Sequence, residues 1–101
     1  MSYFALKGGI TDGCWQSYFN TPGTKVTQVN ITTTNINETD ASEAKVYIGN
    51  RLCCTFPSAV EKSKLYSFTC NSTGDYLKIV SGRNDGKLAF ANVEVIANDN
   101  F

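Results

Sequence analysis

The side chains best suited to gripping a ligand are two arginines and one aspartate in predicted turns. Arg51 follows a Gly-Asn pair, and Arg83 and Asp85 flank Asn84 just before a glycine. Guanidinium and carboxylate groups are planar and form paired hydrogen bonds, which suits them to sugar hydroxyls or carboxylates. These three residues are candidate ligand-binding residues. Asn84–Gly86 also fits a hairpin turn in which Gly86 takes a positive φ.

Three aromatic residues follow the Asp12-Gly13 turn signal and offer apolar ring faces. Trp15 suits stacking on the C–H groups of a sugar, although its large ring also favours the core. Tyr18 and Phe19 are adjacent, so an extended chain points them to opposite sides. We therefore expect one exposed aromatic here, with Trp15 and Tyr18 as candidates for a binding rim or subunit contact.

The composition argues against catalysis and against nucleic acid. The 101 residues include no histidine, so Ser-His-Asp and Cys-His machinery is excluded. The carboxylates are scattered without the pairing that a glycosidase needs. Nine basic and nine acidic residues give a net charge of zero, whereas electrostatic binding to nucleic acid or to a membrane surface usually requires a basic surplus. The sequence predicts a binding protein rather than an enzyme.

Four cysteines, Cys14, Cys53, Cys54 and Cys70, form an even set in a small chain. An all-cysteine zinc site usually brings spaced C-x2-C pairs, which are missing, so disulfides are predicted. A ring between Cys53 and Cys54 would distort their peptide bond. Two long-range bridges are therefore favoured over a vicinal one.

Three N-x-[ST] sequons begin at Asn30, Asn37 and Asn71 and mark candidate glycosylation sites. Together with the cysteines they favour a secreted or cell-surface protein, while a cytosolic location stays open. Residues 1–7 do not resemble a signal peptide. No run of residues approaches the roughly 20 apolar positions of a membrane span.

The elements that must position these residues are all β. Alternation of apolar and polar residues predicts strands over Lys25–Thr34, Lys45–Ile48, Leu65–Cys70, Asp75–Ser81 and Lys87–Ala97. Turn signals occur at Lys7–Gly9, Asp12-Gly13, Thr21–Gly23, Gly74-Asp75 and Asn84–Gly86. A phase change near Ala91-Asn92 predicts a bulge or break. Asp40–Lys45 fits a helical turn. Short strands without intervening helices predict one antiparallel two-sheet sandwich over residues 1–101.

The second half of the chain resembles the F-type (fucose-binding) lectins and, more distantly, discoidin and coagulation-factor C-type domains. The resemblance rests on the motifs V-Y-I-G-N, F-T-C, D-Y-L-K-I-V and V-E-V, and on D-G-C-W-Q-S near the start. It implies a jelly-roll β-sandwich of the galactose-binding-like type. It also implies that Cys54 or Cys53 pairs with Cys70, which leaves the other cysteine for Cys14.

The resemblance has consequences for ligands as well. It implies a structural calcium ion, for which Asp12 and Asn92 occupy the family's ligand positions. It also implies carbohydrate binding, so a glycan or glycoprotein is the expected partner. The family's sugar site uses a histidine and an Arg-x-Asp motif before the I-G-N strand, whereas Arg83–Asp85 follows that strand. This departure favours the alternative of a structural or adhesive module that assembles with other chains.

Overall fold

The computed structural model describes the backbone of residues 2–98 and the side chains of residues 13–98. This part of the chain folds into β-strands with one short 3-10 helix, η1, between the third and fourth strands. The strands are β1 (Ser2–Asp12), β2 (Cys14–Tyr18), β3 (Thr24–Thr32), β4 (Lys45–Ile48), β5 (Arg51–Thr55), β6 (Leu65–Gly74), β7 (Tyr76–Val80) and β8 (Lys87–Ala97), and η1 spans Glu38–Ala41.

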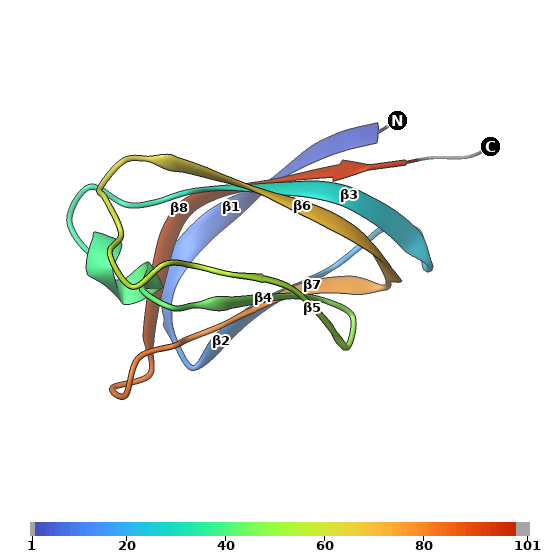
Figure 1. Cartoon of the computed structure of the whole chain (residues 1–101). Helices are drawn as coiled ribbons and strands as arrows, with labels where there is room; N and C mark the ends of the chain where they lie inside the picture. Colours follow the sequence, from blue (N-terminus) through green and yellow to red (C-terminus); the bar gives the residue numbers. More distant parts are fainter. Residues whose placement is uncertain (1, 99–101) are drawn as a thin grey trace.

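The strands form two antiparallel sheets that pack face to face (Figure 1). The first sheet has the order β1-β8-β3-β6, and the second has the order β2-β7-β4-β5. Every connection except that between β4 and β5 therefore crosses from one sheet to the other. This strand order is that of a jelly roll. The predicted all-β antiparallel jelly-roll sandwich is confirmed.

Alternating apolar side chains of both sheets meet in the core. Leu77 and Ile79 of β7 are buried from the second sheet, and Val29 and Ile31 of β3 are buried from the first. Burying one such side chain stabilises the fold by roughly 1.5–3 kcal/mol before its entropy cost. The intervening residues of each strand face outward, so the alternation that builds the core also decides which side chains meet solvent.

The strands predicted from alternation correspond to β3, β4, β6, β7 and β8. The predicted turn at Lys7–Gly9 is wrong, because this segment lies inside β1, with Lys7 opposite Asn92 and Gly9 opposite Phe90. Pairing with β8 holds these glycines in extended backbone in spite of their freedom. The helical turn predicted at Asp40–Lys45 is present as η1, which begins two residues before the predicted start, at Glu38.

The turn predicted at Asn84–Gly86 is present, and Gly86 has a φ of 74°. It does not close a hairpin, because β7 and β8 lie in different sheets. The segment instead crosses from the second sheet to the first. The amide of Gly13 donates to the carbonyl of Gly86 at 2.7 Å, which fixes this crossing to the β1–β2 turn.

The phase change predicted in β8 is real, although its cause differs. Leu88 and Phe90 are buried at one parity, and Val93 and Val95 at the other. The pairing with β1 keeps a single register, with only the pair at Ala91 left out. β8 curves at this point, and the residues before it extend beyond β3 toward the second sheet (Figure 1). Bending, rather than an inserted residue, changes the inward side.

A disulfide joins the two sheets at one side of the sandwich. Cys53 of β5 is bonded to Cys70 of β6, with their Cα atoms 5.3 Å apart. This confirms the expected bridge to Cys70. The predicted second bridge is wrong, because Cys14 and Cys54 are free. They lie in the two edge strands of the second sheet, about 14 Å apart at the usual strand spacing, whereas a disulfide requires Cα atoms within about 7 Å.

Candidate functional site

The structure divides the predicted ligand-binding residues between the two ends of the second sheet. Arg83 and Asp85 lie in the segment after β7. Arg51 begins β5, and Tyr18 ends β2 opposite Tyr76, the first residue of β7. β7 alone spans about 13 Å between these ends. The five predicted residues therefore do not form one site.

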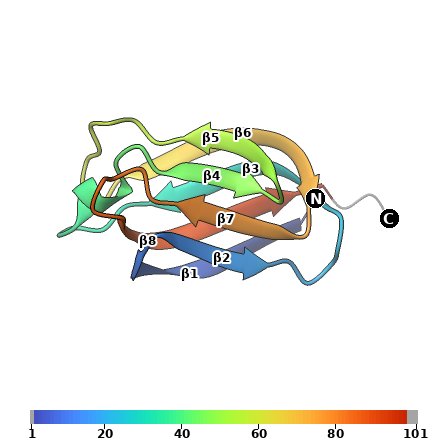
Figure 2. The same ribbon diagram turned by 90° about the horizontal axis from the view of Figure 1, so that it is seen from below.

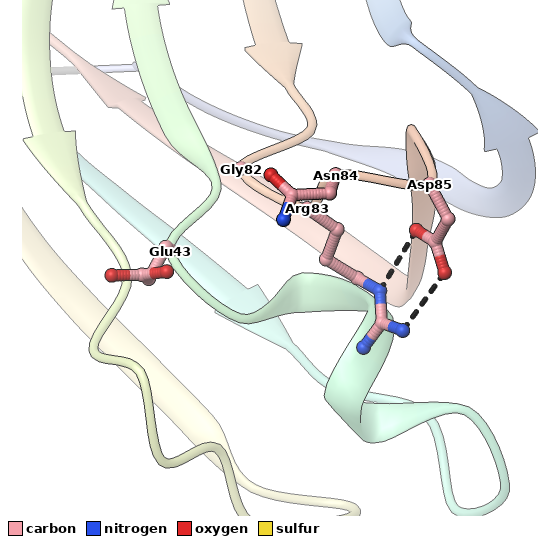
Figure 3. Close-up of a pocket in the computed structure, with 5 residues that line it drawn as sticks. All are labelled: Glu43, Gly82, Arg83, Asn84 and Asp85. Atoms are coloured by element: carbon pink, nitrogen blue, oxygen red, sulfur yellow. Dashed lines mark hydrogen bonds and ion pairs between the residues drawn. The ribbon is translucent and has the colours of Figure 1, made fainter.

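Arg83 and Asp85 form a two-pronged ion pair (Figure 3). Nε of Arg83 donates to Oδ1 of Asp85 at 3.0 Å, and Nη2 donates to Oδ2 at 2.8 Å. Nη1 of Arg83 donates to the carbonyl of Thr39 at 3.1 Å, and Oδ1 of Asp40 lies 3.8 Å from Nε. Each guanidinium nitrogen is thus engaged, and the arginine ties the β7–β8 segment to η1.

The pairing shifts the pKa of both groups. The Arg83 hydrogen bond, followed by that from the backbone amide of Lys87, holds the pKa of Asp85 well below its usual range. The same carboxylate raises the pKa of Arg83. Both stay ionised across the physiological range. The pair is a structural tie in which Asp85 also accepts the Lys87 amide at 3.0 Å.

A shallow depression of about 320 Å³ lies beside this tie. Its walls are Glu43 and the segment Gly82–Asp85, and Glu43 lies apart from the Arg83–Asp85 pair (Figure 3). Gly82 packs so closely on Glu43 that a Cβ at position 82 would overlap the Glu43 carbonyl. The depression has no aromatic wall, and its arginine is already occupied, so it offers little to a sugar.

The opposite end of the second sheet has a different character. Two adjoining hollows, of about 290 and 310 Å³, share Gly49, Asn50 and Tyr76, and we call them together the Tyr76 corner. The first hollow lies on the outer face of the sheet and includes Lys78. The second turns to the end of the sandwich and includes Arg51.

Close backbone packing builds the Tyr76 corner. The amide of Gly49, which has a φ of 59°, donates to the carbonyl of Tyr76 at 2.9 Å. A Cβ on Gly74 would lie 2.9 Å from the nitrogen of Gly49, so only glycine lets the two turns approach this closely. The hydroxyl of Tyr76 donates to Oδ1 of Asn50 at 3.0 Å, which fixes the tyrosine over the turn.

Arg51 is exposed in the Tyr76 corner and, unlike Arg83, has no hydrogen bond or ion pair among the side chains of residues 13–98. Asp75 lines the same hollow, and its Oδ1 accepts the amide of Gly23 at 2.8 Å. The corner therefore combines a free guanidinium, a partly used carboxylate and an aromatic ring. The predicted site combined Arg51 or Arg83 with Asp85 and an aromatic residue; at this corner Asp75 takes the place of Asp85 beside Arg51.

Aromatic side chains continue from this corner onto the outer face of the second sheet. The strands of this sheet lie in front in Figure 2. Tyr18 is 69% exposed, and its ring lies 5.4 Å from that of Tyr76. In the next row of the sheet, Lys78 lies between Gln16 and Tyr47. We call these outward residues, together with Leu52 opposite Tyr47, the tyrosine face.

Trp15 lies on the other side of β2. Its ring meets that of Phe90 edge-on, with centroids 5.1 Å apart, and packs against the buried core. The expectation of one exposed aromatic in this segment holds for Tyr18, because Phe19 is 9% exposed. Tyr76, Tyr47 and Asn50 were missed as site residues, although the alternation of β7 and β4 already places both tyrosines outward.

The residues proposed for calcium do not come together. Asp12 is paired with Lys87, whereas Asn92 is paired with Lys7, so the two are separated by five residues of β8, about 16 Å of strand. A calcium ion needs six to eight oxygens within about 2.6 Å. Within the described residues, no three Asp, Glu or Cys side chains gather as a metal site. Asp12 and Asn92 therefore do not form the calcium site that the resemblance implies.

The three sequons differ in accessibility. Asn71 is exposed on the edge strand β6. Asn30 is half-buried in the central strand β3, where its Oδ1 accepts from Nε2 of Gln28 at 2.7 Å. Asn37 is half-buried before η1, and its backbone amide donates to Oγ1 of Thr34 at 3.1 Å. Asn71 therefore presents the most open acceptor amide of the three.

Comparisons with known proteins identify the fold. No protein-family model and no curated protein matches the chain. Among solved structures, an F-type lectin (fucolectin) from the serum of striped bass, Morone saxatilis, superposes with a TM-score of 0.78 at 22% identity. The match covers 99% of this chain but 36% of the fucolectin chain.

A second match is the CBM36-1 domain of a multidomain xylanase from the hindgut metagenome of Trinervitermes trinervoides, with a TM-score of 0.51 and 17% identity. It covers 95% of this chain and 78% of that domain's chain. Among the residues described, no helix has both the length and the apolar character needed to cross a membrane. The resemblance to F-type lectins is confirmed at the level of the fold, which this chain shares with a lectin and with a carbohydrate-binding module.

Proposed function

We propose that this chain is a carbohydrate-binding module and that its glycan binds at the Tyr76 corner. The observation that carries the proposal is the unpaired guanidinium of Arg51 beside the half-buried ring of Tyr76, which contacts the exposed ring of Tyr18. The arginine at the other end of the sheet is committed to Asp85 and Thr39. Of the two predicted arginines, the proposal therefore keeps Arg51 and sets Arg83 aside.

The chemistry of the corner suits a sugar. The C–H groups of a pyranose ring pack on the aromatic faces of Tyr18 and Tyr76. Asn50 uses its Oδ1 to accept from Tyr76, which leaves its amide hydrogens for a hydroxyl. Arg51 offers paired donors, and Asp75 retains one carboxylate oxygen as an acceptor. Stacking orients the ring, and these polar groups select its hydroxyl pattern.

The fold and the cysteines support the same function and an extracellular location. The similar structures are described as a fucolectin and as a carbohydrate-binding domain. A disulfide such as Cys53–Cys70 persists in oxidising compartments. We therefore place the chain in the secreted or cell-surface space, as a binding domain without catalysis. Its partner is a glycan or glycoprotein.

A glycan array with matched variants tests the proposal. Wild type should bind a defined set of glycans, and Tyr76→Ala and Arg51→Ala should each reduce that binding at least tenfold. Arg83→Ala is the matched control, because it removes an arginine at the other end of the same sheet that is already engaged by Asp85 and Thr39. Loss of binding in Arg83→Ala with full binding in Arg51→Ala would contradict the proposed site. Silence of wild type on a broad array would contradict the function itself.

A second candidate function is assembly with other protein chains. It is favoured by exposed apolar surface on the tyrosine face, where Tyr18 is 69% and Leu52 is 53% exposed. Exposed apolar groups that cluster on one face mark protein interfaces as well as ligand sites. Light scattering coupled to size-exclusion chromatography distinguishes the two. A stable oligomer that Leu52→Ser dissociates would support assembly, whereas a monomer that binds glycans supports the module.

A further inference from the structure

From the charges that surround the tyrosine face, we infer that the bound glycan is acidic. The inference rests on the proposed carbohydrate-binding function and adds the chemical class of the ligand. Strands β2, β7, β4 and β5 contain three cations, Lys45, Lys78 and Arg51, and no carboxylate. This composition is uneven for a chain whose net charge is zero.

The cations of this sheet are free to meet a ligand. Lys78 faces outward between Gln16 and Tyr47, and it lines the first hollow of the Tyr76 corner. Lys45 and Arg51 are exposed. The ion pairs among the described side chains involve other residues, namely Lys64 with Glu61 and Arg83 with Asp40 and Asp85. An ammonium or guanidinium without a partner beside an aromatic face is suited to a carboxylate or sulfate of a sugar.

Four of the seven acidic side chains of residues 13–98 gather at the other end of the sheet. Glu38, Asp40, Glu43 and Asp85 all belong to η1, to the residues just after it or to the β7–β8 segment, at the far end of the second sheet. Asp75 is the one carboxylate that lines the hollows of the Tyr76 corner, and one of its oxygens is held by Gly23. An anionic chain is therefore attracted to the corner, where the two cations Arg51 and Lys78 face one carboxylate.

The shape of the surface favours an extended ligand over one terminal sugar. The two hollows are neighbours, because both are lined by Gly49, Asn50 and Tyr76. Arg51 lines one hollow and Lys78 lines the other. A chain of several sugars that carries a charge on more than one residue reaches both cations. A single neutral sugar has no charged group that could pair with either cation.

Affinity electrophoresis and calorimetry with matched polymers test the inference. Polygalacturonic acid against fully methyl-esterified pectin isolates the carboxylate, and dextran sulfate against dextran isolates the sulfate. In about 50 mM salt, at least one acidic member should bind tenfold or more tightly than its neutral partner. The preference should fall as salt rises, because screening weakens it.

Variants locate the effect. Lys78→Gln should weaken binding of the acidic polymer three- to tenfold, Lys78→Arg should restore most of it, and Lys25→Gln, on the first sheet, should leave it unchanged. Equal affinity for acidic and neutral polymers, or an equal loss in Lys25→Gln, would overturn the inference. So would a single-stranded oligonucleotide that binds as tightly as the acidic glycan.

The outcome also separates this inference from the function on which it rests. If neutral glycans bind, if Tyr76→Ala abolishes that binding and if acidic glycans are not preferred, the carbohydrate-binding function stands and the inference of an acidic ligand fails. Absence of binding to every acidic and neutral polymer removes both. Circular dichroism of each variant confirms that a loss of binding is not a loss of folding.

Discussion

The hydroxyl of Tyr76 donates a 3.0 Å hydrogen bond to the side-chain oxygen of Asn50, and this bond joins the start of β7 to the β4–β5 turn. The two residues meet because Gly49 and Gly74 allow their turns to touch. The bond holds the Tyr76 side chain against the turn and leaves the side-chain amide hydrogens of Asn50 unused by this contact. The geometry of the proposed site thus depends on two turns rather than on the sheets alone.

Replacing Tyr76 with phenylalanine separates the ring from the hydroxyl. Tyr76→Phe keeps the stacking surface and loses one hydrogen bond at a solvent-accessible position, so the free energy of unfolding should fall by about 0.5 kcal/mol. Glycan affinity should fall less than fivefold, whereas Tyr76→Ala should lose tenfold or more. Isothermal titration with the best array glycan measures both. Equal losses in the two variants would mean that the hydroxyl, and not the ring, makes the contact.

The Arg83–Asp85 pair should stabilise the fold in a pH-dependent way. The pKa of Asp85 is held below its usual range in the folded chain, so the unfolded state takes up the proton first as the pH falls. The contribution of the pair is therefore complete above about pH 4, near the ordinary aspartate value, and is lost progressively below it. Wild type should be more stable than Asp85→Asn at pH 7, and the difference should narrow between pH 4 and pH 2.

Urea denaturation at each pH measures this difference. Asp75→Asn serves as a comparison, because its carboxylate accepts one amide and has no arginine partner in the described structure. A gap between wild type and Asp85→Asn that stays constant from pH 7 to pH 2 would contradict an ionised tie. Glycan binding at pH 7 should be the same in wild type and in Asp85→Asn.

The Cys53–Cys70 disulfide should contribute substantially to stability. It closes a loop with a sequence separation of 17, for which the chain-entropy model gives roughly 3 kcal/mol. Cys53→Ser with Cys70→Ser should therefore lower the urea midpoint markedly, whereas Cys14→Ser should leave it within error. A double variant as stable as wild type would show that the bridge is dispensable.

The two free thiols should differ in reactivity. Cys14 is exposed, whereas burial raises the pKa of the half-buried Cys54 to about 12. Only a thiolate reacts rapidly, so iodoacetamide at pH 8 should label Cys14 and leave Cys54 intact. Labelling of Cys54 should appear in denaturant or as the pH approaches 12. A disulfide bond between Cys14 and Cys54, detected by mass spectrometry, would contradict the arrangement of the strands.

The sequence predicted the sandwich because its strands bury alternate residues. In β7, Leu77 and Ile79 alternate with Tyr76 and Lys78, and the structure buries the first pair and leaves the second partly accessible to solvent. β1 was not predicted, because Lys7–Gly9 contains two glycines and its extended form depends on pairing with β8. Pairing partners far along the chain are not encoded in local alternation.

The candidate site was predicted in part. Arg51 and Tyr18 were predicted and lie at the Tyr76 corner, whereas Asp75 and Tyr76, which meet them there, were not predicted. Of the other predicted residues, Trp15 packs against the core, and Arg83 and Asp85 lie at the other end of the sheet. Arg83 and Asp85 lie two residues apart, so they bind each other, which proximity in sequence favours. The topology alone decides that the β4–β5 and β6–β7 turns share one corner. The same topology keeps Cys14 from Cys54.

The location of the bound glycan is tested most directly by nuclear magnetic resonance. Titration of the ¹⁵N-labelled chain with the glycan that binds best should shift the amides of Tyr18, Asn50, Arg51, Tyr76 and Lys78. The amides of Gly82–Asp85, at the other end of the sheet, should stay in place. Shifts confined to Gly82–Asp85 and η1, with the Tyr76 corner unchanged, would contradict the account.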